Sequence, residues 1–252
     1  MHDDPFSLSQ YLQRTLIDGH KRPVIISVIG SGGKTSVIER IALLGKRCHL
    51  RVLVTTTTHM ALPSDHQYPF GVYRADDIEN LPLDDEHVML VGNWSEKRVK
   101  PLTTGQFESL RGHFDMILIE ADGARGMELK YHRESEPVIR ADTDILIKVL
   151  GLNALGKKSA QTIHNCFLWR GCEDKIVDEH IVHALAFDPR GLNATSDAPV
   201  QMMLYNQSDT LDKSRLGTLI ESGLQYFRES RDSIVIGSVK QDAIEYIYRA
   251  RG

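Results

Sequence analysis

The chain of 252 residues has few cysteines and lacks a long apolar run. Its three cysteines, Cys48, Cys166 and Cys172, are an odd and sparse set. Such a set is a poor basis for a disulfide framework and fits a reducing compartment. No stretch approaches the roughly 20 apolar residues that a membrane helix needs, and residues 1–5 are polar, with no apolar signal core behind them. These absences predict a soluble, cytoplasmic protein.

The chain also lacks a large excess of charge of one sign. Its formal net charge is -4, and 25% of its residues are charged. This balance does not favour general attraction to nucleic acid, and the basic run at residues 97–100 is typical of a solvated surface. With 41% hydrophobic residues, the chain is long enough for one sizeable core. We therefore expect neither nucleic acid nor a membrane as a partner.

Short apolar runs alternate with segments of helical periodicity. Strands are expected at residues 24–29, 51–55, 88–91, 116–119, 145–149, 200–205 and 233–236. Helices are expected at residues 6–19, 35–46, 107–114, 177–187, 211–228 and 241–250. Strands separated by helices predict an α/β fold, a three-layer sandwich whose mostly parallel sheet has helices on both faces.

A glycine-rich turn lies between the first expected strand and the helix after it. Residues 30–35 read Gly-Ser-Gly-Gly-Lys-Thr. Glycines allow positive φ and close approach of phosphates, while turned N–H groups and a helix N-terminus bind anions. Lys34 is expected to reach the β- and γ-phosphates, and the Thr35 hydroxyl to ligate Mg²⁺. The turn therefore predicts a nucleoside triphosphate, GTP or ATP, bound with Mg²⁺ by Gly30, Ser31, Gly32, Gly33, Lys34, Thr35 and Ser36.

The turn is shorter than the common phosphate-loop motif G-x-x-x-x-G-K-[ST]. Val28 stands where that motif requires its first glycine, so the pattern here is G-x-x-G-K-T. This short form resembles the loop of the Mur ligase and folylpolyglutamate synthetase families. With the flanking strand and helix, it predicts a P-loop NTPase-like fold. We expect one nucleotide-binding domain over residues 1–252, with room for a small insertion around residues 125–199.

Acidic residues follow the expected strand at residues 116–119. Glu120 and Asp122 lie where open α/β sheets bind ligands, and an acid there can hold Mg²⁺. We favour Glu120 as the metal ligand, with Asp122 as the alternative or as the group that positions water or an acceptor. Arg125 is expected to neutralise phosphate charge, although a surface arginine fits the pattern equally well.

Several other residues are candidates for a substrate site. Thr55, Thr56, Thr57 and Thr58 end a strand and could order metal-bound water or bind an oxyanion; ordinary strand sequence is the alternative. Lys130 could reach an anionic ligand, and residues 132–137 could line the same site. His164, Cys166 and Cys172 do not follow a standard zinc spacing, so a packed loop is the favoured interpretation there.

A late strand is followed by a segment similar to the guanine-reading N-K-x-D motif of GTPases. Asn206 could tie the base loop to the phosphate loop, and Asp209 could accept hydrogen bonds from guanine. Ser238 lies in a segment that resembles the S-A-K motif of such pockets. Gln207 replaces the usual lysine, which weakens the match. Together these residues favour guanine slightly over adenine.

Several of these segments occur in one order along the chain. They read V-I-G-S-G-G-K-T-S, V-L-V-T-T-T-T, I-L-I-E-A-D-G-A-R-G-M-E-L-K, E-P-V-I and T-D-I-L-I-K-V-L-G-L-N-A-L-G. This combination, over about residues 24–156, resembles the YqeC family of accessory proteins for selenium-dependent molybdenum hydroxylases. The resemblance implies a P-loop fold and a cytoplasmic role in cofactor maturation, with a molybdenum hydroxylase or a maturation protein as partner. Arg125 departs from the lysine that the family often has, and Gln207 departs in the base segment.

Three functions are compatible with these residues. The first is an NTP-dependent accessory protein that hydrolyses its nucleotide during maturation of a molybdenum or selenium cofactor. Its catalytic residues are expected to be Lys34, Glu120, Asp122 and Arg125. The second is a ligase or kinase, similar to Mur ligases, that forms an acyl phosphate. The third is a regulator that binds nucleotide without turning it over.

Overall fold

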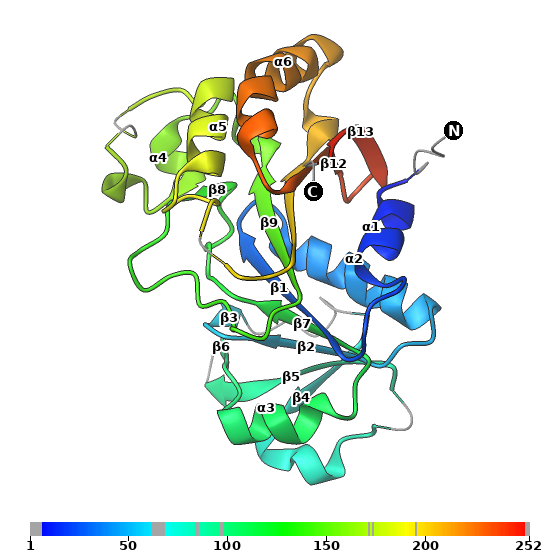
Figure 1. Ribbon diagram of the computed structural model, residues 1–252. Coiled ribbons are helices and arrows are strands. Elements are labelled where there is room, and N and C mark those ends of the chain that lie inside the picture. Colours follow the sequence, from blue (N-terminus) through cyan, green and yellow to red (C-terminus); the bar gives the residue numbers. More distant parts are fainter. Residues whose placement is uncertain are drawn as a thin grey trace.

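A mostly parallel sheet forms the centre of the molecule (Figure 1). The computed structural model describes residues 7–61, 69–83, 86–95, 98–170, 172, 174–194 and 196–249. The strand order is β13-β12-β11-β9-β1-β7-β2-β5-β6-β3, with β4 paired to β5. The parallel strands are β1 (Val24–Gly30), β2 (Val52–Thr56), β4 (Gly71–Arg74), β5 (Val88–Ser95), β7 (Met116–Glu120), β9 (Ile145–Gly151), β11 (Val200–Asn206) and β12 (Ser233–Ser238).

Antiparallel pairs occur only at the two ends of this sheet among the residues described. They involve β3 (Met60–Ala61), β6 (Arg98–Lys100) and β13 (Ala243–Tyr248). A separate two-stranded sheet pairs β8 (Leu129–Lys130) with β10 (Ile163–His164). The helices are α1 (Leu8–Leu16), α2 (Lys34–Arg47), α3 (Thr104–Arg111), α4 (Ser159–Thr162), α5 (Glu179–Phe187) and α6 (Lys213–Glu229).

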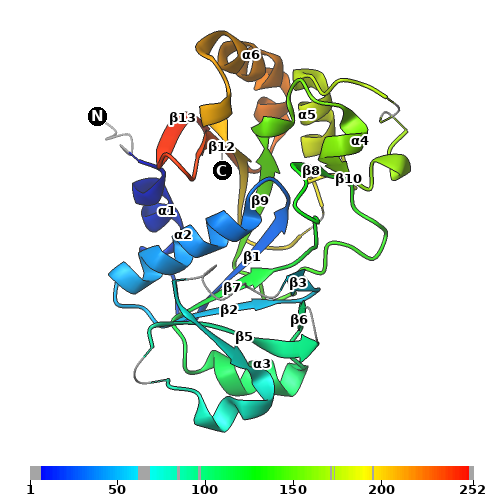
Figure 2. The same ribbon diagram turned by 180° about the vertical axis from the view of Figure 1, so that it is seen from behind.

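Helices cover both faces of the sheet, because both faces of its central strands are apolar. In β1, Ile26 and Val28 pack with α1 and α2, whereas Ile25 packs in the cluster that contains Phe107 of α3. In β11, Tyr205 packs with residues of α5 and α6. Figures 1 and 2 show α1 and α2 together on one side of the sheet, away from α3, α5 and α6. The three-layer α/β fold predicted from the sequence is therefore confirmed.

The range around residues 125–199 contains a central strand of the main sheet as well as smaller elements. It includes β9, which lies between β1 and β11 in the middle of the sheet. The small sheet of β8 and β10, together with α4 and α5, lies beside the end of β9 (Figure 2). In the chain, β8 precedes β9, and α4, β10 and α5 lie between β9 and β11.

The expectation of a C-terminal helix at residues 241–250 is wrong, because this segment forms β13. Its β-branched and aromatic residues alternate between the two faces: Ile244 and Ile247 pack in one core cluster, and Tyr246 and Tyr248 pack in another. Such residues favour strands when an edge is available to pair with. The antiparallel partner β12 supplies that edge, with a register shift after Ile236. The apolar residues Ile244, Ile247 and Tyr248 are also spaced as on one face of a helix, and such spacing predicts a helix.

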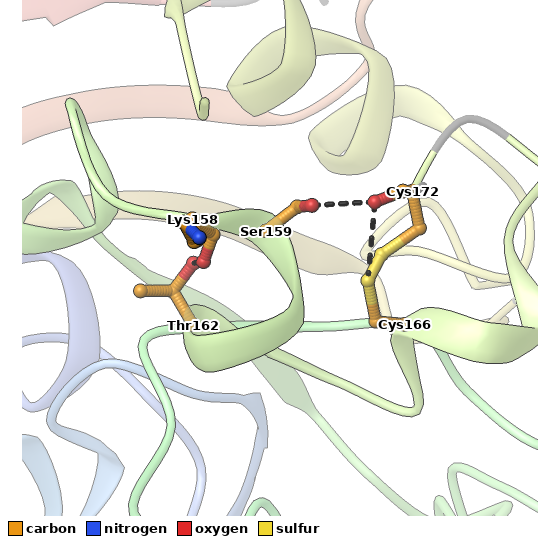
Figure 3. Close-up of a disulfide and its surroundings, with 5 residues drawn as sticks. All are labelled: Lys158, Ser159, Thr162, Cys166 and Cys172. Atoms are coloured by element: carbon orange, nitrogen blue, oxygen red, sulfur yellow. Dashed lines mark hydrogen bonds between the residues drawn. A yellow bond between two sulfur atoms is a disulfide. The ribbon is translucent and has the colours of Figure 1, made fainter. Parts of the chain in front are cut away.

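The expectation that the cysteines form no disulfide framework is wrong for one pair. Cys166 and Cys172 form a disulfide, with their Cα atoms 5.5 Å apart. A 3-10 turn, η3 (Cys166–Leu168), brings the two residues together. The Ser159 hydroxyl donates a 2.5 Å hydrogen bond to the Cys172 carbonyl and joins this turn to α4 (Figure 3). Cys48 is a free thiol.

None of the helices in the described ranges is both long enough and apolar enough to cross a membrane.

The stability of the layer formed by α5 and α6 should depend on pH through His183. This side chain is fully buried, with Nδ1 3.1 Å from the Tyr205 hydroxyl and Nε2 3.0 Å from the Leu219 carbonyl oxygen. Burial lowers the pKa of His183 below its ordinary value of 6.5, so the unfolded chain binds more protons than the folded chain. The free energy of unfolding should therefore decrease as the pH falls below 6.5.

The measurement is urea unfolding of the wild type and of His183→Gln between pH 7.5 and 5.5. The wild type should lose more stability over this range, by about 1.4 kcal/mol for each unit between its folded and unfolded pKa values. Equal losses in the two proteins would show that His183 is not the group responsible.

Candidate functional site

The glycine-rich loop between β1 and α2 has a backbone that requires glycine. Gly30, Gly32 and Gly33 have φ values of 97°, 70° and 109°. A Cβ atom at Gly30 would collide with the Val149 carbonyl oxygen, and one at Gly33 would lie 2.5 Å from Asn206 Nδ2. Both the turn and the close approach of neighbouring chains therefore exclude larger side chains.

The first half of the loop is fastened to the protein by its own N–H groups. Gly30 donates to Asp122 Oδ2 at 2.7 Å, Ser31 to the Val149 carbonyl at 2.9 Å, and Gly32 to the Met127 carbonyl at 3.0 Å. These three N–H groups are therefore bonded within the protein and shape the loop, although Ser31 and Gly32 line the cavity beside it.

The second half of the loop keeps its donors available for a ligand. Helix α2 begins at Lys34, with Gly33 as its N-cap. The first N–H groups of a helix have no partner within the helix, and they carry its positive end. Gly33, Lys34 and Thr35 all line a cavity of about 590 Å³, whereas Ser36 is exposed and is not part of the lining. Within the described part of the chain, the loop N–H groups without a backbone partner therefore start at Gly33.

Lys34 folds back over the loop that precedes it. Its Nζ donates to the Gly30 carbonyl at 2.6 Å and forms an ion pair with Asp122 Oδ1 at 2.9 Å. Burial acts to lower the pKa of Lys34, but the carboxylates of Asp122 and Glu120 outweigh it and raise the pKa. The amine therefore stays charged at the wall of the cavity.

Asp122 is the buried anchor of the loop. Its side chain has no exposure to solvent, and besides Lys34 and Gly30 N–H it contacts His132 Nε2 at 2.6 Å and Lys130 Nζ at 3.5 Å. Burial acts to raise the pKa of Asp122, yet Lys34 and the hydrogen bond from His132 lower it. Since Asp122 does not line the cavity, its expected role in holding the metal or positioning water does not fit its place.

Glu120 is the carboxylate that faces the cavity. It is the last residue of β7, is 7% exposed, and makes no side-chain hydrogen bond or ion pair with the residues that the structure describes. Burial raises the pKa of Glu120, Lys34 acts against this, and Asp122 adds to it. A buried carboxylate without a partner is well suited to a cation. Of the two expected acids, Glu120 lines the cavity and Asp122 does not.

Three exposed arginines add positive charge to the cavity wall. Arg125 was expected there, and Arg133 belongs to the range 132–137 that could line the same site, whereas Arg98 was not recognised from the sequence. None of the three side chains forms a hydrogen bond or an ion pair within the described part of the chain. Arg98 reaches the site from β6, which pairs antiparallel with β5. No local sequence pattern predicts that pairing.

The threonine run contributes little to the cavity. Thr56 donates its hydroxyl to the Glu120 carbonyl at 2.8 Å, and Thr57 donates to the Val138 carbonyl at 2.6 Å. Thr55 is 2% exposed and lies away from the lining, so only Thr58 of the four lines the cavity. The expectation that four hydroxyls face the ligand is therefore wrong. Thr56 thereby joins β2 to β7, and Thr57 joins the residue after β2 to the segment at Val138.

Lys130 also lies outside the cavity. Its side chain is fully buried, and its Nζ donates to the Gly123 carbonyl at 2.5 Å and contacts Glu136 Oε2 at 2.9 Å. The expectation that Lys130 reaches an anionic ligand is wrong, because its charge is already held by Glu136 and Asp122.

The segment after β11 is joined directly to the phosphate loop. Asn206 Nδ2 donates to the Gly32 carbonyl at 2.9 Å, and Asn206 Oδ1 accepts from Val239 N–H at 3.0 Å. Ser238 donates to Asp209 Oδ1 at 2.6 Å. Gln207 lines the cavity, whereas Asp209 is exposed and is not part of the lining. Two segments that are far apart in sequence thus meet behind the loop.

Comparisons with known proteins identify the family. The family model described as YqeC protein matches residues 26–166. Uncharacterized protein YqeC of Escherichia coli (strain K12) is 38% identical over 156 residues, which are 59% of this chain and 60% of that relative's length. Among solved structures, the MinC:MinD cell division protein complex of Aquifex aeolicus aligns with a TM-score of 0.41 and 13% identity, over 85% of this chain and 81% of that one. On the family model, which matches more than half of the 252 residues, the chain belongs to the YqeC family.

Proposed function

We propose that the chain binds a nucleoside triphosphate with Mg²⁺ in the cavity beside the phosphate loop and hydrolyses it. The observation that carries this proposal is the meeting of three features in one cavity of about 590 Å³. These are the N–H groups that begin α2, the unpartnered carboxylate of Glu120, and the unpaired arginines. Pockets of roughly 300–1,000 Å³ are typical of small-ligand sites, so the triphosphate fits this space.

The donor set at the cavity fits Mg²⁺. Magnesium prefers oxygen ligands and is commonly held by one or two protein groups together with substrate phosphates. Thr35 and Glu120 both line the cavity and would hold the ion. When bound, Mg²⁺ supplies neutralisation of phosphate charge. Lys34 and the N–H groups of Gly33 and Thr35 stabilise charge on the transferred phosphoryl group, and Arg125 adds to this.

The base is guanine in this proposal, with adenine as the alternative. Asn206 ties the base segment to the phosphate loop, and Ser238 orients Asp209 through a 2.6 Å hydrogen bond. A carboxylate held in this way can accept hydrogen bonds from the N–H and amino groups of guanine. Gln207 lines the cavity, and its Oε1 accepts a hydrogen bond from Asn153 N–H at 3.2 Å.

The cellular role is proposed from family membership. Resemblance to YqeC accessory proteins supports a cytoplasmic role in maturing selenium-dependent molybdenum hydroxylases or their cofactor, with such a hydroxylase or a maturation protein as partner. A second candidate function is phosphoryl transfer to an acceptor, as in a ligase that forms an acyl phosphate. The short G-x-x-G-K-T loop and a further cavity that shares Arg125 and Arg133 with the first favour it. Steady phosphate release without an acceptor would count against this second function.

Replacing Lys34 tests nucleotide binding. Lys34→Ala should weaken binding of Mg·GTP and Mg·ATP roughly tenfold or more, because it removes a charge-assisted contact to phosphate. Equilibrium dialysis with ATP, GTP and CTP, followed by phosphate release, measures both affinity and turnover. Lys46→Ala is the matched control, since Lys46 is exposed in the last turn of the same helix. Unchanged affinity and rate in Lys34→Ala would refute the proposal.

Replacing Glu120 tests the metal site separately from the loop. Glu120→Gln keeps the size of the side chain but removes its charge, so the Mg²⁺ concentration at half-maximal turnover should rise roughly tenfold or more. Nucleotide binding without Mg²⁺ should not weaken, because the substitution removes a negative charge that would repel the phosphates when no metal ion lies between them. Glu245→Gln, on the exposed side of β13, is the control. A wild-type Mg²⁺ dependence in Glu120→Gln would exclude Glu120 as a ligand.

Base preference can be tested through the 2-amino group of guanine. ITP differs from GTP only in lacking that group, so wild type should bind GTP more tightly than ITP by about tenfold or more, the contribution of one hydrogen bond to a charged acceptor. Asp209→Ala should bring the two affinities together. A wild-type ratio near one, measured by competition, would show that Asp209 does not read the base.

A further inference from the structure

A second cavity of about 730 Å³ adjoins the nucleotide cavity. Its lining combines aromatic and aliphatic side chains with three arginines, and no residue of the phosphate loop or α2 belongs to it. The residues that matter most for its chemistry are Arg125, Arg133, Phe167, Trp169 and Arg170. Pockets with an apolar wall and a few convergent polar groups are typical of small-molecule sites.

The aromatic wall is unusually open to solvent. Phe167 is 79% exposed, and Trp169 lies two residues later in the same turn. The disulfide between Cys166 and Cys172 closes the segment that carries both rings, and Ser159 ties that segment to α4 (Figure 3). A held aromatic surface loses little entropy when a flat ligand packs on it. This wall is therefore suited to an aromatic ring.

The charge of the lining is positive. Arg125, Arg133 and Arg170 make no side-chain hydrogen bond or ion pair with the described residues, and among those residues Asp174 alone adds a carboxylate to the lining. Three positive charges and one negative charge leave two unbalanced positive charges. Burial and the nearby Lys130 lower the pKa of His164, which also lines the cavity, so His164 adds no charge near neutral pH. The cavity is therefore complementary to an anion.

The two cavities share part of one wall. Arg125, Met127, Arg133 and His164 line both of them. A molecule in the second cavity therefore lies next to the space assigned to the triphosphate, separated from the phosphate loop by this shared wall.

We propose that the second cavity binds a small anionic molecule with an aromatic ring, beside the nucleotide. The ring packs against Phe167 and Trp169, and the anionic group is held by Arg133 and Arg170. This site goes beyond the proposed NTP binding, and its occupation does not require the nucleotide, because the nucleotide-binding groups of α2 are absent from its lining.

Two dyes that differ by one charge test the proposal. The probes are 8-anilinonaphthalene-1-sulfonate and the neutral N-phenyl-1-naphthylamine, which have the same ring system. In the absence of nucleotide, fluorescence titration should show that the sulfonate binds about tenfold more tightly, because guanidinium groups form charge-assisted hydrogen bonds with it. Equal affinities for the two dyes would overturn the proposal.

Exposed residues allow variants that keep the fold. Arg133→Gln should weaken binding of the sulfonate about tenfold and leave the neutral dye unchanged, and Phe167→Ala should weaken both dyes about threefold or more. The matched controls are Arg228→Gln and Ile176→Ala, an exposed arginine and an exposed apolar residue outside the cavity. Wild-type binding in both cavity variants would contradict the proposal.

The outcome can be separated from that of the proposed function. Lys34→Ala should bind the sulfonate dye as the wild type does, because Lys34 does not line the second cavity. If nucleotide binding fails while the dyes follow the expected pattern, the second site stands and only the proposed function falls. Loss of sulfonate binding in folded Lys34→Ala would place the dye in the nucleotide cavity and overturn the assignment.

Discussion

The loop that faces the first cavity depends on one buried carboxylate, that of Asp122. An isolated charge without exposure to solvent is costly, so its partners must be in place. Asp122 has four: Lys34 Nζ, Gly30 N–H, His132 Nε2 and Lys130 Nζ. Removing one partner of a buried ion pair typically costs about 3–5 kcal/mol. The same network therefore holds the end of β1, the segment after β7 and the loop in one arrangement before any ligand arrives.

This constraint separates the tasks of two acids that the sequence places only two residues apart. Asp122 is turned under the loop and is satisfied by the protein, whereas Glu120 is turned to the cavity and lacks a partner among the described residues. Sequence spacing alone cannot distinguish them, because both follow the same buried strand. The distinction comes from Gly30 and His132, which reach Asp122 from distant positions in the chain.

What the sequence predicts well is local. The apolar runs that form β1, β7 and β9, and the loop before α2, follow from periodicity and from glycine chemistry within a few residues. What it misses depends on long-range pairing. The strand β13 needs the free edge of β12, Arg98 reaches the site through the pairing of β5 with β6, and Lys130 is neutralised by Asp122 and Glu136. The hydroxyls of Thr56 and Thr57 are unavailable for the same reason, since backbone carbonyls of other segments accept their hydrogen bonds.

The wall shared by the two cavities has a consequence for how their ligands affect each other. Two anions in neighbouring spaces repel each other, and Arg125 and Arg133 are the groups placed to reduce that repulsion. An arginine that is bound to one anion attracts the other anion less strongly. The sign of the coupling therefore depends on which of the two anions each guanidinium group binds. Whatever its sign, the coupling free energy is the same in both directions. In the proposed arrangement, replacing Arg125 or Arg133 would therefore change this coupling, whereas Lys34 lines only the first cavity.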